Sequence, residues 1–512
     1  MKKLISLLLA LVMVFSLVAC GNTNTDTKGE STKESVDESK DQSKDESKDE
    51  GKEGAANGEK VEIKYLILSA GDGKDAVEKA INDRLNALGK NYTVKLLLMG
   101  WDNLNERVGL SARGAAGPED TFDLATTASW IGPYQTLVDE DTLLELDPIL
   151  EEAAPKLAES LTEEQKAAVT IDGHMYGIPT VIDKAIIARD HLLWNVNELA
   201  EIGMKPEDVE NIRDIEGLEP ILKKYKEKFP DSYPLFGKHW GNRRNNFIET
   251  AKDGSYVVQN PYESAEYKKA GELAQKYRDA GYMHPRIDEE GSDDIHKQEK
   301  WLVRRDEGEP SAEETWTNQY EMPIKAYTFE KDNVILNGIV QGKLTSIYKH
   351  TKHPKEALNF IELVRFDKEI QNILSYGIEG VNYDIKDGKV VAKEKVADKD
   401  KWEPWQNQFS NDLRIPTDKG TALDDPAMKE RIEKHNSELY GSADLGFTPS
   451  KELREEMNAA QADLTQVTDI ERGRFNENYD SLVQTLKDRN IDEIVQKLKT
   501  EFDAWYKEHH KN

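Results

Sequence analysis

The chain has 512 residues, a formal net charge of -29 and a single cysteine. This acidity excludes a nucleic-acid binder that follows phosphates with a basic face, and it disfavours adhesion to an anionic membrane surface. About 450 residues follow the first 60, which is enough for two or three domains. One cysteine forms no internal disulfide, so stability must come from ordinary hydrophobic cores.

The N-terminus has the pattern of an export signal. Residues 1–3 supply positive charge, and residues 4–18 form an apolar run too short to span and hold a bilayer. The run ends in the sequence Leu-Val-Ala-Cys-Gly, which resembles the bacterial lipobox. In a lipobox, small residues allow the signal peptidase to approach and the cysteine thiol accepts a diacylglycerol; here that thiol would be the one of Cys20. A buried structural thiol is the alternative.

We therefore expect residues 1–19 to be a signal peptide and Cys20 to be the first mature residue. Two acyl chains such as palmitate, usually joined by a third, are enough for stable anchoring. This predicts a lipoprotein on the outer face of the cytoplasmic membrane. Residues 20–60 contain almost no apolar side chains and predict a disordered tether. A specific binding role for the charges of the tether is the alternative.

Beyond residue 60, strands and helices alternate. The expected order is a strand at Val61–Leu68, a helix at Asp75–Leu88, a strand at Tyr92–Met99, a helix from its cap at Asp102 to Arg113, and a strand at Phe122–Ala125. This β-α-β-α-β order predicts an α/β fold with a mainly parallel sheet. Ligands of such sheets bind outside the carboxyl ends of the strands.

The rest of the chain is mostly helical by its apolar periodicity. Helices are expected at Ser264–Ala280, from Pro354, from Asp367, at Tyr479–Leu486 and at Ile491–Trp505.

Several segments match a known family. Ile171–Pro179 is similar to the D-G-x-x-Y-G-I-P stretch of carbohydrate-type solute-binding proteins, and Lys352–Ile361 is similar to their return segment P-E-x-A-x-x-F-I. Tyr376–Gly380, Leu445–Phe447 and Leu486–Trp505 resemble the LplA-like lipoproteins, whose C-terminal domain has no assigned function. The order and spacing of the matches carry the resemblance.

The resemblance implies a two-lobed, periplasmic-binding-protein-like α/β fold with hinge strands and a ligand cleft. Lobe one would comprise residues 61–179 and about 347–415, and lobe two residues 180–346 and about 416–512. The implied function is capture of a saccharide, in particular an oligosaccharide, for an ABC importer. The implied partners are two transmembrane permease subunits and a cytoplasmic ATPase. We expect a monomer without a cofactor or metal.

Two segments depart from the family pattern. Trp301–Met322 is unusually charged and matches nothing, and the second crossover between the lobes, near Gly338–Ser346, has a faint signal.

Saccharide recognition needs flat aromatic faces and fixed hydrogen-bonding groups. Trp130 follows the third strand, so we expect it at the ligand-facing end of the sheet. The alternative is that Trp130 packs under the segment that follows it. The hydroxyls of Thr126, Thr127 and Ser129 are candidate ligand contacts, whereas Asp123, within the strand, is expected to be structural.

Asp72, in the loop after the first strand, belongs to the same rim. Its neighbours Gly71–Ala76 mimic a dinucleotide-binding turn, but export excludes that role, and we expect the glycines to permit a tight turn.

Further candidates lie elsewhere in the chain. Trp240 and Trp316 occur in polar surroundings in the second lobe, where they either contact the ligand or pack beneath a loop. Tyr176 and Glu379 border the matched segments, where they either line the cleft or hold the crossover together.

Catalytic patterns are sparse. There is no G-x-S-x-G nucleophile motif, and acid pairs cannot be identified by spacing among 98 carboxylates. His350 and His353 have no third ligand at a defined spacing, which argues against a metal site. The remaining alternative is a lipid-anchored carbohydrate-active enzyme, and the hinge and return segments favour the binding protein over it.

Overall fold

The computed structural model describes residues 60–101, 104–117, 121–180, 189–237, 240, 246–286, 300–308, 312–328, 333–410, 412–418 and 426–510. The predicted signal peptide, Cys20, the predicted tether up to residue 59, and Asp102 lie outside these ranges. Within them, no helix has the length and apolar character needed to cross a membrane.

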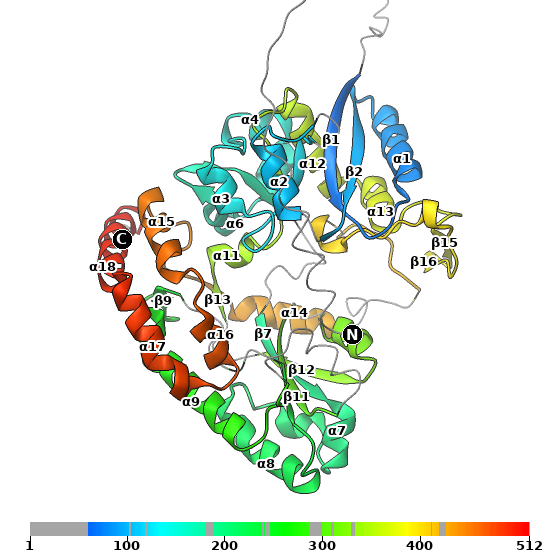
Figure 1. The fold of residues 1–512 in the computed structure, drawn as a ribbon. Helices are drawn as coiled ribbons and strands as arrows, with labels where there is room; N and C mark the ends of the chain where they lie inside the picture. Colours follow the sequence, from blue (N-terminus) through cyan, green and yellow to red (C-terminus); the bar gives the residue numbers. More distant parts are fainter. Residues whose placement is uncertain are drawn as a thin grey trace, which may run out of the picture. The chain divides into compact units, whose positions relative to one another are not determined.

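A five-stranded sheet organises the first part of the fold (Figure 1). Its strands, in spatial order, are β2 (Tyr92–Met99), β1 (Val61–Leu68), β3 (Leu124–Thr127), β14 (Leu344–Ile347) and β6 (Gly177–Pro179). β14 runs antiparallel to both of its neighbours, and the other strands run parallel to one another. The predicted bounds of β1 and β2 and the mainly parallel sheet are confirmed.

Helices cover this sheet and share one hydrophobic core with it. α1 (Lys74–Ala87) buries Val77, Ile81 and Leu85 of the predicted apolar face. Leu88, predicted on the same face, is the C-cap of the helix and is 37% exposed. The other helices of this region are α2 (Leu104–Ala112), α3 (Tyr134–Asp139), α4 (Asp147–Ala153), α5 (Pro155–Ser160), α6 (Glu163–Val169), α11 (Asn337–Val340), α12 (Pro354–Phe366) and α13 (Lys368–Tyr376). Two hairpins complete it, β4 (Thr170–Ile171) with β5 (His174–Met175), and β15 (Tyr383–Lys386) with β16 (Lys389–Ala392).

The third strand differs from the prediction. The sequence predicts Phe122–Ala125, whereas β3 runs from Leu124 to Thr127. The Asp123 carboxylate accepts a hydrogen bond from the Lys64 N–H at 2.8 Å, just before the strand begins, so Asp123 is structural as predicted. At the other end, β14 pairs with β3 up to Thr127 and extends it by two residues.

A second sheet has the order β12 (Ile324–Thr328), β7 (Arg189–Asn195), β11 (Val303–Gly308) and β8 (Leu235–Phe236). It packs with α7 (Val196–Glu201), α8 (Glu219–Lys228), α9 (Ala265–Asp279) and α10 (Ala312–Tyr320). The segment Trp301–Met322, which has no counterpart in the family pattern, supplies β11 and α10. β11 carries the charged run from Arg304 to Glu307, whereas Trp301 before the strand and Trp316 of α10 are buried.

The C-terminal helices build a third core together with α9 and the hairpin of β9 (Ile248–Thr250) and β10 (Tyr256–Val258). They are α15 (Lys451–Gln461), α16 (Thr465–Glu471), α17 (Phe475–Asp488) and α18 (Ile491–His509), and α14 (Pro426–Glu438) precedes them. α17 lies beside α9 (Figure 1). A short strand pair, β13 (Val334–Ile335) with β17 (Tyr440–Gly441), joins this part to the segment before α11.

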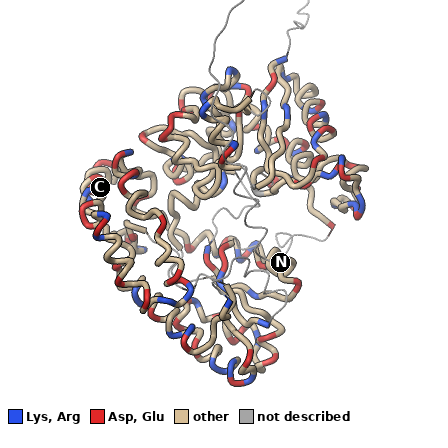
Figure 2. The backbone as a smooth tube through the Cα atoms, viewed as in Figure 1, with Lys and Arg blue, Asp and Glu red and all other residues tan. Residues whose placement is uncertain are grey.

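Charged residues of both signs are interspersed along these helices (Figure 2). Many form surface ion pairs, such as Lys499 with Asp503 at 2.6 Å and Lys276 with Glu219 at 2.6 Å. Exposed pairs of this kind contribute little to stability.

We call the region around the first sheet the first lobe and the regions around the other cores the second lobe. The first core draws on residues 63–178 and 340–409. The predicted boundary between residues 346 and 347 therefore falls inside β14, which belongs to the first sheet. The sequence signal of this crossover is faint because β14 has only four residues, all of them buried.

Candidate ligand-binding site

Three tryptophans meet at one edge of the first sheet. The indole rings of Trp101 and Trp130 are nearly parallel, with centroids 6.1 Å apart and planes at 23°. Trp405 stands edge-on to both, at 5.2 Å and 67° from Trp101 and at 5.7 Å and 88° from Trp130. Together they form an aromatic corner, which we call the tryptophan corner.

The strands of the first sheet place all three rings. Trp101 comes two residues after β2, and Trp130 comes three residues after β3, so both lie at the carboxyl edge. The Nε1–H of Trp130 donates to the Gly342 carbonyl at 2.9 Å, which fixes the orientation of its ring. The backbone N–H of Trp405 donates at 2.9 Å to the carbonyl of Leu68, the last residue of β1.

The loop after β1 supports the segment that carries Trp405. The N–H groups of Ala70 and Gly73 donate to the carbonyls of Glu403 and Lys401 at 3.0 and 2.9 Å. A Cβ atom on Gly71 would lie 2.3 Å from the Lys401 oxygen. The glycines therefore permit a close backbone approach rather than the tight turn expected from the sequence. Asp72, between them, is exposed on this rim.

The corner is unusually open for its size. Trp101 is 47% exposed and Trp130 is 55% exposed, although each has a large apolar face to bury. A contiguous exposed aromatic surface marks a binding site more often than a scattered apolar residue does. Flat indole faces suit the C–H faces of pyranose rings, and nearby polar groups suit their hydroxyls. Ser129, next to Trp130, is exposed, and its hydroxyl donates to the Gly338 carbonyl at 2.8 Å.

The structure does not support ligand contacts by Thr126 and Thr127. Both lie inside β3 and are buried, because the strand extends beyond its predicted end. The Thr127 hydroxyl is hydrogen-bonded to Ser346 of β14 at 2.7 Å. The expectation that these hydroxyls belong to the loop at the ligand edge is therefore corrected.

The two tryptophans expected in the cleft of the second lobe are core residues. Trp240 is 1% exposed within the core of α8, α9 and the second sheet. Trp316 is 5% exposed and packs in an edge-to-face arrangement with the His191 ring, with centroids 5.4 Å apart. Their polar neighbours in the sequence predict exposure wrongly, because alternate residues of a strand or helix can face a core.

The remaining two candidates are Tyr176 and Glu379. Tyr176 is half-buried between β5 and β6, and burial, followed by the charges of Glu145 and Asp172, raises its pKa. Glu379 is exposed in the loop after α13, where it pairs through the backbone with Tyr383. Neither has a contact with the three tryptophans among the interactions that the structure records.

Trp101 and Trp405 are additions to the predicted site. Trp101 obeys the strand-end rule that located Trp130 and was within reach of sequence reasoning. Trp405 was not, because backbone hydrogen bonds of its segment to Leu68 and to the loop after β1 bring it to the edge. Within the described ranges, no cluster of histidine, cysteine and carboxylate side chains suits a metal ion. His350, one of the two histidines considered for a metal, instead contacts the Phe122 carbonyl at 2.8 Å.

Residues 80–397 match the sequence profile of the bacterial extracellular solute-binding proteins, and the chain belongs to this family. Membership implies a location outside the cytoplasm.

A curated relative is a carbohydrate ABC transporter substrate-binding protein from Streptococcus pneumoniae. It is 22% identical over 355 residues, which cover 65% of this chain and 68% of the relative.

Solved structures show the same two-lobed α/β fold. The N-glycan transport solute binding protein of S. pneumoniae aligns with a TM-score of 0.73 at 19% identity, over 88% of this chain and 100% of that chain. An HMO-binding, ABC-transporter-associated solute binding protein from Bifidobacterium longum infantis aligns with a TM-score of 0.59 at 15% identity, over 88% and 100% of the two chains. These likenesses agree with the fold class predicted from the sequence.

Proposed function

We propose that this protein captures an oligosaccharide outside the cell and delivers it to an ABC importer. The observation that carries the proposal is the tryptophan corner, with two half-exposed, nearly parallel rings and a third ring edge-on to both. The relatives give independent support, since one is a carbohydrate transporter component and another handles N-glycans.

Each part of the corner has a role in this proposal. Trp101 and Trp130 offer faces on which successive sugar rings stack, and Trp405 closes one side. Asp72 and Ser129, exposed on the rim, accept hydrogen bonds from sugar hydroxyls. Because the Trp130 ring is held by Gly342, the platform is formed before the ligand arrives, which lowers the entropic cost of binding.

Delivery requires partners and an anchor. We assign the transport step to two permease subunits and a cytoplasmic ATPase, which this family type implies. Ligand contacts with both lobes would favour a closed state that the permease recognises. The lipobox-like sequence at Cys20 supports lipidation and retention on the outer face of the membrane.

A glycan panel tests the proposal. The mature protein is mixed with neutral and acidic oligosaccharides, and its melting temperature is recorded. A ligand that binds only the native state raises it. We expect at least one oligosaccharide to do so, and mass spectrometry to recover it intact.

Two results would contradict the proposal. If no saccharide raised the melting temperature, the proposal of saccharide capture would be contradicted. Shortened products would replace a transport role with the enzyme alternative.

A further inference from the structure

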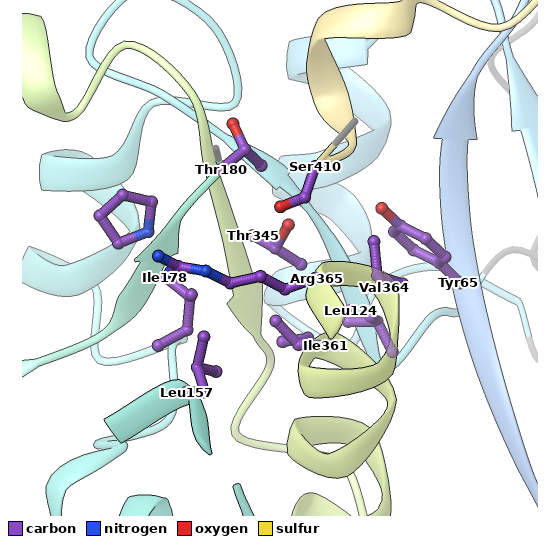
Figure 3. Close-up of a pocket in the computed structure, with 11 residues that line it drawn as sticks. Tyr65, Leu124, Leu157, Ile178, Thr180, Thr345, Ile361, Val364, Arg365 and Ser410 are labelled. Carbon is purple, nitrogen blue, oxygen red and sulfur yellow. The ribbon is translucent and has the colours of Figure 1, made fainter. Parts of the chain in front are cut away.

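A small pocket lies under α12 on one face of the first sheet (Figure 3). Its walls are apolar where Leu157, Ile178 and Ile361 line it, and polar where Tyr65, Thr180 and Thr345 line it. The side chain of Arg365, from the last turn of α12, reaches across it. We call it the Arg365 pocket.

The guanidinium of Arg365 has an unmet requirement. Its Nη1 atom is buried and has no hydrogen-bond partner among the described residues. Burial lowers the pKa of Arg365, but an arginine stays protonated in proteins, so the charge remains. The negative charge of Asp412 favours the protonated guanidinium of Arg365. Oδ1 of Asp412 accepts a hydrogen bond from the side chain of Gln371 at 3.2 Å. A buried guanidinium N–H group without an acceptor is costly.

Besides Arg365, the pair of Tyr65 and Thr345 offers the pocket a hydrogen atom to donate. The hydroxyls of Tyr65 and Thr345 are hydrogen-bonded to each other, which leaves one O–H of the pair free to donate. Thr126 is two residues beyond the pocket residue Leu124 on β3, so it points to the same face of the sheet. Its buried Oγ1 has no partner among the described residues either. No carboxylate lines the pocket.

The size of the pocket limits what it can hold. Its cavity volume is about 10 Å³, about the space that one water molecule or one monatomic ion requires. A sugar ring, a carboxylate ligand or a phosphate does not fit. We propose that the Arg365 pocket binds a small inorganic monoanion, for which chloride is the prototype. This site is separate from the proposed saccharide site.

The pocket lies where the chain leaves the first lobe and returns to it. Thr180 follows β6, and its backbone N–H and hydroxyl both donate to the Lys343 carbonyl, at 3.0 and 3.2 Å. Lys343 precedes β14. An anion held between Arg365 and these segments ties both connections to α12.

Bromide gives a direct test, because it replaces chloride and scatters anomalously. Crystals of the mature protein soaked in bromide should show an anomalous peak beside Nη1 of Arg365. Absence of the peak, with a water in the same place, would overturn the proposal.

Thermal stability gives a test in solution. At constant ionic strength, replacing gluconate by chloride should raise the melting temperature of the wild type by about 2 °C or more. Arg365→Met should lose this dependence, because it removes the charge and fills the pocket with an apolar chain. The matched control is Arg113→Met, which removes an exposed arginine paired with Glu140 at 2.7 Å and should keep it.

Further results separate the site from general salt effects. Chloride should slow hydrogen exchange of the amides near Thr180 and Thr345 in the wild type, and not in Arg365→Met. An equal shift of melting temperature in the wild type and Arg365→Met would place the anion elsewhere and overturn the assignment.

Discussion

At the scale of single residues, the position of a tryptophan relative to a strand end was a better guide than the polarity of its neighbours. Trp130 and Trp101 both follow strands of the first sheet and both are about half exposed. Trp240 and Trp316 occur in polar stretches and are buried. Neighbours in the sequence do not share a face, whereas strand ends of a parallel sheet share an edge.

The tryptophan corner predicts a loss of affinity without a loss of fold. Trp130→Ala should weaken oligosaccharide binding by about 1 to 3 kcal/mol, since it removes a stacking face. Its melting temperature should change little, because the ring is 55% exposed. Isothermal titration and thermal unfolding measure the two effects. Trp505→Ala on α18 is the control, with unchanged affinity. A large fall in melting temperature with full affinity would make Trp130 a structural residue.

His191 predicts a dependence of stability on pH. Burial lowers its pKa to about 3, and its Nδ1 contacts the Arg189 carbonyl at 2.7 Å. The nearby charges of Arg189, His435 and Arg431 also disfavour protonation. The unfolded chain, with a histidine pKa near 6.5, binds the proton first as pH falls. Stability contributed by neutral His191 is therefore complete above about pH 6.5 and decreases below it.

The expected size of this effect is about 2 kcal/mol in the free energy of unfolding between pH 7 and pH 5. Denaturant titrations at several pH values measure it. His191→Asn retains a side-chain N–H for the Arg189 carbonyl and should flatten the slope by that amount. An identical slope in the variant would show that other groups cause the acid sensitivity.

At the scale of elements, local signals located the long helices and strands, while short strands escaped them. Asp367, predicted to begin a helix, caps α13 by accepting the Ile370 N–H at 3.0 Å. The expected helix at Ser264–Ala280 is α9, with Ser264 as its cap. β14 and the end of β3 could not be predicted, since four buried residues have no periodicity of their own.

The packing of α9 against α17 predicts an intolerant glycine. A Cβ atom on Gly271 would lie 2.3 Å from Cδ2 of Phe475, which is itself buried. Gly271→Ala should therefore destabilise the protein by about 1 to 3 kcal/mol, despite the better helix propensity of alanine. Gly109→Ala in α2 is the control, because its Cβ would meet only the end of the Arg113 side chain.

Denaturant unfolding compares the two variants. The control should be neutral or slightly stabilising. Equal stability of both variants would mean that α17 shifts without cost.

At the scale of the whole molecule, the C-terminal helices, which belong to the second lobe, also contact the first lobe. Arg454 of α15 forms an ion pair with Asp139 at the end of α3, in the first lobe. α16 and α17 pack on α9 of the second lobe. If the lobes close, the contacts of α15 with the first lobe must therefore either be kept or be replaced by other contacts.

Attachment to the membrane also belongs to this scale. Cys20→Ala should abolish incorporation of labelled palmitate and leave a precursor that the lipoprotein signal peptidase does not cleave, because the acyl acceptor is absent. Metabolic labelling and the mass of the chain measure this. Ser39→Ala, within the predicted tether, is the control and should be lipidated. Undiminished labelling of Cys20→Ala would remove the lipid anchor from the proposal.

Sequence alone determined the export signal pattern, the α/β class, the family resemblance and the position of Trp130, because each depends on local composition, periodicity or a strand end. Tertiary structure decided the tryptophan corner, since the segment of Trp405 reaches Trp101 and Trp130 through backbone hydrogen bonds to Leu68 and to the loop after β1. It also decided the burial of Trp240 and Trp316 and the Arg365 pocket. Those features depend on packing between segments far apart in the chain, and hydrophobic periodicity does not encode such partners.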